Sequence, residues 1–98
     1  MASQKIIYSR GFPYGAPLVM IRGGGTKIEG VRTCLHAHGF SWDGQLHAYK
    51  NYMNSPELRK ILLILRNVYG CEIVPKSGLD INYIIDLEQG IIDKKEIV

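Results

Sequence analysis

The segment from Ser55 to Tyr69 constrains the fold more than any other part of the chain. Ser55-Pro56-Glu57 is a helix start, with serine as cap, proline at the first helical position and an acid near the positive end of the helix dipole. Apolar residues then recur at helical spacing, at Leu58, Ile61, Leu62, Leu65 and Val68 or Tyr69, before Gly70 ends the helix. Leu63 and Ile64 widen this stripe, so the helix needs a deep position or a partner subunit beside it.

The polar residues of the same helix are expected to face outward, namely Arg59, Lys60, Arg66 and Asn67. The apolar stripe requires a surface to pack on, and the remaining segments predict a sheet. Residues 5–10 and 18–22 are short β-rich runs, and the Gly- and Pro-containing residues 11–17 between them predict a hairpin with a long loop.

A first helix is expected between this hairpin and a third strand. Thr26-Lys27-Ile28-Glu29 is a capping box, in which threonine and glutamate each satisfy a first-turn amide, and Gly39 supplies the left-handed stop. Asp43-Gly44 marks a tight turn, with the aspartate capping its own backbone, and residues 45–52 then alternate as a third strand.

The C-terminal part predicts a second hairpin. Residues 71–74 have the composition of a strand, residues 75–78 that of a turn, and residues 79–87 have apolar side chains at every odd position, as in a longer strand. The tail 88–98 is expected either to form a short strand or to fray. The order ββαβαββ therefore predicts an α+β two-layer domain, with two helices on one mixed or antiparallel sheet.

Length and charge narrow the classes of protein. The 98 residues suffice for one domain, 1–98, with its core in about 5–87. No apolar run is long enough to cross a bilayer and no signal peptide is evident, so we expect a cytoplasmic protein without a membrane partner, with Cys34 and Cys71 reduced.

Residues 1–66 carry nine Lys or Arg against three Asp or Glu, whereas residues 67–98 carry three against six. A polyanion bound to the basic part fits this asymmetry, and so does a mixed solvated surface.

The glycine-rich corner at residues 22–27 is the predicted phosphate contact. Three glycines let backbone N–H groups approach an anion at the start of a helix, and Arg22 and Lys27 flank them. A plain strand–helix connector would use the same glycines. The spacing matches neither a Walker A loop nor a dinucleotide-binding fingerprint.

The stretch from Gly25 to Tyr49 resembles a family pattern. Gly25-Thr26, a helix, Gly39-Phe40-Ser41-Trp42-Asp43-Gly44 and then Tyr49 is similar to G-T-(helix)-G-x-x-W-D-G-x-x-x-x-A-[WY] in small α/β modules beside helicases and in mobile-element proteins, including the HARP domain of annealing helicases. The resemblance covers residues 18 to 74 and implies binding near nucleic acid without catalysis by the module. Ser41 and His47 stand where family members often have a basic residue.

The aromatic residues of this stretch have two interpretations. Trp42 beside a tight turn is expected to plug the helix–strand corner, and the alternative is a platform on which a base stacks. Tyr49 and Tyr52 lie an odd number of positions apart, so they should face opposite sides of the strand. The predicted nucleic-acid-binding residues are Arg22, Gly23, Gly24, Gly25, Lys27, Arg32, Trp42, Tyr49 and Lys50.

Metal and enzyme chemistry are not expected. On a helix Cys34 and His38 share a face, whereas His36 points away. His47 is the one further ligand that could join them, and a fourth ligand for a metal ion is not evident. Glu29 and Asp43 already have capping roles. The sequence predicts a non-catalytic nucleic-acid-binding accessory module without cofactor; the alternative is a protein-interaction or inhibitor module, of viral or plasmid origin, that docks or dimerises through helix 58–69 or a sheet edge.

Overall fold

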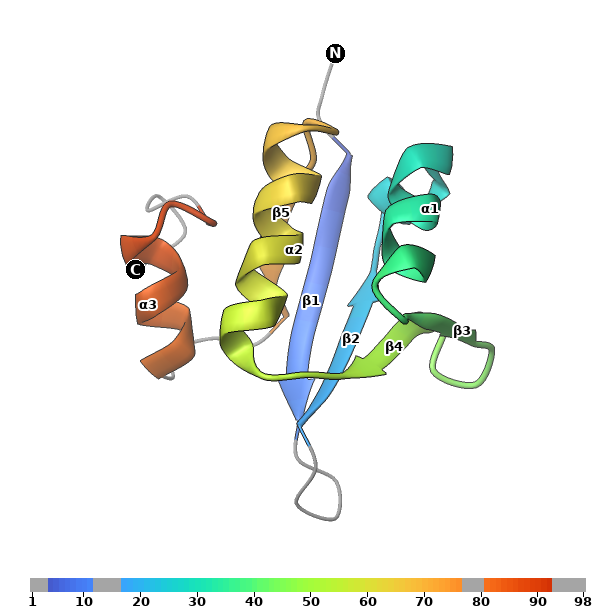
Figure 1. Ribbon diagram of the computed structural model, residues 1–98, viewed down its shortest axis with the longest axis horizontal. Coiled ribbons are helices and arrows are strands. Elements are labelled where there is room, and N and C mark those ends of the chain that lie inside the picture. Colours follow the sequence, from blue (N-terminus) through green and yellow to red (C-terminus); the bar gives the residue numbers. More distant parts are fainter. Residues whose placement is uncertain (1–3, 12–16, 77–80, 93–98) are drawn as a thin grey trace.

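Five strands form one mixed sheet in the computed structural model, which describes residues 4–11, 17–76 and 81–92 (Figure 1). In chain order the strands are β1 (Lys5–Gly11), β2 (Leu18–Arg22), β3 (Ser41–Asp43), β4 (Ala48–Tyr52) and β5 (Glu72–Pro75). The helices are the short 3-10 helix η2 (Gly24–Lys27), α1 (Glu29–Ala37), α2 (Ser55–Asn67) and α3 (Ile81–Glu88). The predicted α+β class with a mixed sheet is confirmed.

The strands lie across the sheet in the order β3-β4-β2-β1-β5. β1 and β2 form the expected antiparallel hairpin, with Tyr8 opposite Ile21. β4 is antiparallel to β2 and β3 is antiparallel to β4, whereas β5 pairs with β1 in parallel. β4 and β5 therefore run in the same direction, and two such strands of one sheet need a long crossover connection. α2 is part of this connection and covers the sheet (Figure 1).

The core lies between the sheet and the helices. Alternate strand residues point to the helix side, and four of them are at most 2% exposed: Ile6, Tyr8, Val19 and Ile21. The helices bury Val31 and Leu35 of α1 and Leu58, Ile61, Leu62 and Leu65 of α2 in the same cluster. The predicted stripe of α2 is therefore confirmed, and of its two alternative last residues Tyr69 packs against the core while Val68 is 69% exposed.

The last predicted strand, residues 79–87, is wrong, because the chain forms α3 at Ile81–Glu88. Apolar residues at every second position also include pairs at helical spacing, such as Ile81 and Ile85, so alternation alone does not exclude a helix. The expected turn at 75–78 lies partly outside the described residues. Beyond α3, Ile91 and Ile92 are buried, so the described part of the tail belongs to the core.

Arg59 was expected to face outward, and this is also wrong. Its side chain is buried, and its Nε lies 2.7 Å from Asp86 Oδ1 of α3. Asp86 is fully buried and also accepts bonds from Arg10 at 3.0 and 3.1 Å and from the Tyr8 hydroxyl at 2.6 Å. Arg59 of α2 is buried because it pairs with the Asp86 carboxylate of α3. The sequence of α2 alone does not indicate this contact.

The predicted strand 45–52 is observed as the shorter β4, Ala48–Tyr52, and β3 pairs with it as an additional strand. Its N-terminal residues belong to the turn between β3 and β4, where Asp43 Oδ1 accepts bonds from the amides of Gln45 and Leu46 at 2.9 and 3.0 Å. The expected cap by Asp43 is confirmed. The observed order is ββαββαβα, with η2 before α1, in place of ββαβαββ.

The helix ends were predicted better than the helix starts. Gly39 and Gly70 have φ values of 85° and 68°, as expected for left-handed stops. The capping box is wrong, because Thr26 lies in η2, its hydroxyl donates to Gly23 O at 2.7 Å, and Ile28 precedes α1. α2 has Asn54 rather than Ser55 at its N-cap. None of the helices in the described ranges is long and apolar enough to cross a bilayer.

Candidate nucleic-acid interface

A pair of aromatic rings, of which one is exposed and one is buried, lies at one edge of the sheet. Trp42 of β3 is paired directly with Tyr49 of β4, and their ring centroids are 5.2 Å apart with planes at 65°. Tyr49 is 8% exposed, whereas Trp42 is 52% exposed. The expectation that Trp42 plugs the corner is wrong, because Tyr49 already occupies the inner position and β3 is the outermost strand.

α1 extends this aromatic pair with an imidazole. The His36 ring meets Tyr49 edge to face, with centroids 5.7 Å apart and planes at 83°. Arg32 is exposed one turn earlier on the same face of α1. We call Arg32, His36, Tyr49 and Trp42 the Trp42 edge. Sequence reasoning missed His36, whose helical position two residues from Cys34 indicated only that it faces away from the thiol.

An ion pair holds the turn beside Trp42. Lys50 Nζ lies 2.8 Å from Asp43 Oδ2. The Lys50 hydrogen bond and then the Leu46 amide lower the pKa of Asp43, while the bond to Asp43 raises the pKa of Lys50. Both groups are near the surface, so the pair orients the turn more than it stabilises the fold.

The glycine-rich corner is packed against β1. A Cβ on Gly23, whose φ is 109°, would lie 2.6 Å from Lys5 O, and one on Gly25 would lie 2.8 Å from Ile6 Cδ1. One on Gly24 would lie 2.5 Å from Gln4 Oε1. Close approach to β1 accounts for Gly23 and Gly25, and Gly23 also has a positive φ, as the connector interpretation states, whereas the neighbour of Gly24 is the end of the flexible Gln4 side chain. These contacts account for the glycines without a bound phosphate, and the phosphate contact stays a prediction.

The predicted cations lie in two groups. Arg22 and Lys50 belong to the face of the sheet opposite the helices, since they alternate with Ile21 and Tyr49. Arg22 Nη2 lies 3.7 Å from Met20 Sδ, and Met20 is paired with Lys50. Trp42, Tyr49 and Arg32 are on the helix side. Lys27 is exposed in η2, which precedes the N-terminal end of α1. The nine predicted residues therefore do not form one surface.

The expected divergence of the two tyrosines is confirmed. Tyr52 lies on the face of Lys50 and is 56% exposed, while Tyr49 points into the core. The open face of the sheet is defined by Ile7, Leu18, Met20, Lys50 and Tyr52; among the described residues, no helix lies against it.

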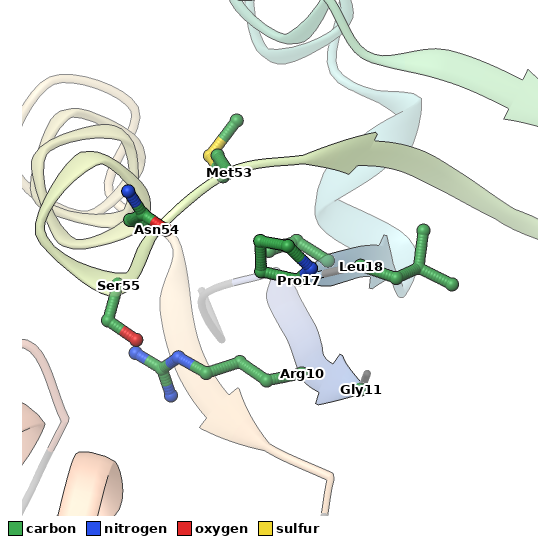
Figure 2. Close-up of a pocket in the computed structure, with 8 residues that line it drawn as sticks. Arg10, Gly11, Pro17, Leu18, Met53, Asn54 and Ser55 are labelled. Carbon is green, nitrogen blue, oxygen red and sulfur yellow. The ribbon is translucent and has the colours of Figure 1, made fainter. Parts of the chain in front are cut away.

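A small hollow lies at the far end of the first hairpin (Figure 2). Its volume is about 120 Å³, and Figure 2 shows the Arg10 side chain extending from the end of β1 toward Ser55 at the start of α2. A second hollow of about 170 Å³ is lined by His38, Met53, Glu57, Lys60 and Ile61. Small-molecule sites measure roughly 300–1,000 Å³, so neither hollow is large enough to enclose such a ligand.

The Cys34 and His38 pair is a local helical contact. Cys34 Sγ lies 3.8 Å from His38 Nδ1, and the same nitrogen lies 2.8 Å from Cys34 O. Burial raises the pKa of the Cys34 thiol, which opposes the thiolate form that metals bind. In the part of the chain that the structure describes, no three His, Cys, Asp or Glu residues could hold a metal ion, and Cys34 and Cys71 are free thiols.

Comparisons with protein-family models, curated proteins and solved structures found no match to this chain.

Proposed function

We propose that the chain is a non-catalytic nucleic-acid-binding module and that the Trp42 edge is its contact surface. The observation that carries this proposal is the half-exposed indole of Trp42, which rests against Tyr49 at a sheet edge. A large aromatic ring left in water is costly, and stacking on a base is one way to cover it.

Charge and chemistry at the same edge support the proposal. Arg32 lies one helical turn from His36, so Arg32 can contact a phosphate while a ring of the Trp42 edge contacts a base. The basic excess of residues 1–66 adds long-range attraction for a polyanion. The resemblance to HARP-like modules, which includes Trp42 and Tyr49, points to the same class of ligand.

Binding of a fluorescent oligonucleotide in low salt tests the proposal. We expect Arg32→Glu to weaken binding and to make the salt dependence shallower, because one phosphate contact contributes a slope of about −0.7 to −0.9 in log K against log salt. Lys60→Glu is the matched control, since Lys60 is exposed on α2 and lies outside the Trp42 edge. Equal loss in both variants would indicate net charge alone, and no binding by the wild type would refute the proposal.

The open face of the sheet favours protein interaction as a second candidate function. Ile7, Leu18 and Met20 are only half-buried there, although they occupy central strands. The apolar stripe of α2 is less suited to docking, because it already lies in the core. Light scattering after size-exclusion chromatography tests this candidate: a dimer that Met20→Lys converts to a monomer supports it, and a monomeric wild type without a copurifying partner counts against it.

A further inference from the structure

We infer that the Trp42 edge takes single-stranded nucleic acid in preference to a duplex, an inference that rests on the proposed function. It depends on which part of a nucleic acid the edge can contact. Trp42 and His36 present exposed rings, Tyr49 packs as a buried ring against both, and Arg32 is the one Lys or Arg of the edge. The chemistry of the edge therefore favours stacking over hydrogen-bond readout.

Base stacking needs a base with an open face. In a duplex each base is covered by its neighbours, and only base edges are accessible in the grooves. Those edges are recognised by side chains that donate and accept in pairs, such as Arg, Asn and Gln. Trp42 has one donor, its indole N–H, so its exposed ring matches an unstacked base better than a groove.

The helix beside the edge is poorly suited to a duplex groove. α1 has nine residues, and it buries Val31 and Leu35 against the sheet. Arg32 is its one Lys or Arg, and Glu29 at its start offsets that charge. A helix that enters the major groove usually contacts several phosphates around it, and α1 lacks the cations for this.

The edge also has a path for a strand. The exposed rings of Trp42 and His36 each meet the buried Tyr49 ring, at centroid separations of 5.2 and 5.7 Å, and Arg32 lies exposed one helical turn from His36. Trp42 can stack on a base while Arg32 holds a phosphate further along. Because few phosphates are contacted, a shallow salt slope is expected, about −0.7 for each phosphate of a single strand.

Tryptophan fluorescence tests the inference directly, because Trp42 is the chain's single tryptophan. A short oligodeoxynucleotide is titrated as a single strand and, separately, annealed to its complement, in the same low-salt buffer. We expect the single strand to quench Trp42 emission and to bind at least about tenfold more tightly than the duplex, the scale of one stacking contact.

Two variants locate the contact by anisotropy of a labelled single strand. Trp42→Ala should weaken binding by roughly tenfold. Tyr52→Ala is the matched control, because Tyr52 is as exposed as Trp42 but lies on the open face, and it should bind like the wild type. Circular dichroism checks that both variants fold.

The outcomes separate the inference from the proposed function. A duplex that binds as tightly as the single strand, without a change in Trp42 emission, overturns the inference and leaves nucleic-acid binding in place. Equal loss in Trp42→Ala and Tyr52→Ala also overturns it. Binding of neither oligonucleotide refutes the proposed function itself.

Discussion

Arg59 of α2 and Asp86 of α3 form a buried ion pair, with 2.7 Å between Nε and Oδ1. Asp86 is inaccessible to solvent, and the side chain of Arg59 is 9% exposed. Tyr8 and Arg10 of β1 bond to the same carboxylate, so Asp86 connects the sheet with two helices. A buried carboxylate with several donors is costly to disturb, since removing it leaves its cationic partners in a low-dielectric interior.

Asp86→Asn should therefore destabilise the fold strongly. We expect a loss of about 3 to 5 kcal/mol in the free energy of unfolding, the usual result when one partner of a buried ion pair is removed. Chemical denaturation followed by circular dichroism measures the change. Glu88→Gln is the control, because Glu88 is exposed on the same helix and its loss should be within about 0.5 kcal/mol. Similar midpoints for the two variants would contradict this role of Asp86.

The Tyr8 hydroxyl makes stability depend on alkaline pH. Burial, followed by the bond to Asp86, raises the pKa of Tyr8 well above its ordinary value of 10.0. The neutral phenol is therefore favoured in the folded state, and its contribution to stability is complete below pH 10 and declines as the pH rises further.

Tyr8→Phe should remove this dependence. We expect it to lower the free energy of unfolding at neutral pH by about 1.5 to 3 kcal/mol, the range for a hydrogen bond to a charged group. Unfolding curves at neutral and alkaline pH measure both effects, and the wild-type advantage should shrink in alkali. An advantage that grows with pH would contradict the assigned direction of the Tyr8 pKa.

The same network explains what sequence patterns could and could not predict. The stripe at Leu58, Ile61, Leu62 and Leu65 is set by local periodicity, which is why α2 was predicted correctly. The burial of Arg59 depends on Asp86, 27 residues away, and no local pattern contains that contact. α3 was mistaken for a strand because its alternating residues satisfy both periodicities, and the bonds of Asp86 to β1 and α2 are long-range.

The glycine corner should respond to substitution as packed structure. Gly25→Ala places a methyl group 2.8 Å from Ile6 Cδ1, so we expect a loss of about 1 to 3 kcal/mol in the free energy of unfolding. Gly44→Ala is the control, because its nearest neighbour would be Trp42 Nε1 at 3.9 Å. Thermal unfolding compares the two. A Gly25→Ala protein with wild-type stability but impaired oligonucleotide binding would restore the corner as a ligand site.

Acid should loosen the turn beside Trp42. The Lys50 bond and the turn amides lower the pKa of Asp43, so the turn is held at every pH above the ordinary aspartate range and is released only as the pH falls through the lowered value. Trp42 emission followed from neutral to acid pH, compared with that of Asp43→Asn, measures this. Wild-type emission should approach that of the variant only in acid, and a transition near neutral pH would contradict the assignment.

The candidate interface was predictable in part. Trp42, Tyr49 and Arg32 were singled out by residue type, because aromatic rings and cations are what nucleic acids bind, but the exposure of Trp42 was not expected. The division of the other cations between two sheet faces follows from strand pairing and register, which the sequence does not specify without its long-range partners. His36 was missed because its contact with Tyr49 joins α1 to β4.

Amide and indole chemical shifts of the labelled protein, titrated with a short single strand, test the central claim most directly. We expect shifts at the Trp42 indole N–H and at the amides of Arg32 and His36, with little change at Met20 and Tyr52 of the open face. Shifts confined to the open face or to the glycine corner, with Trp42 unaffected, would contradict it.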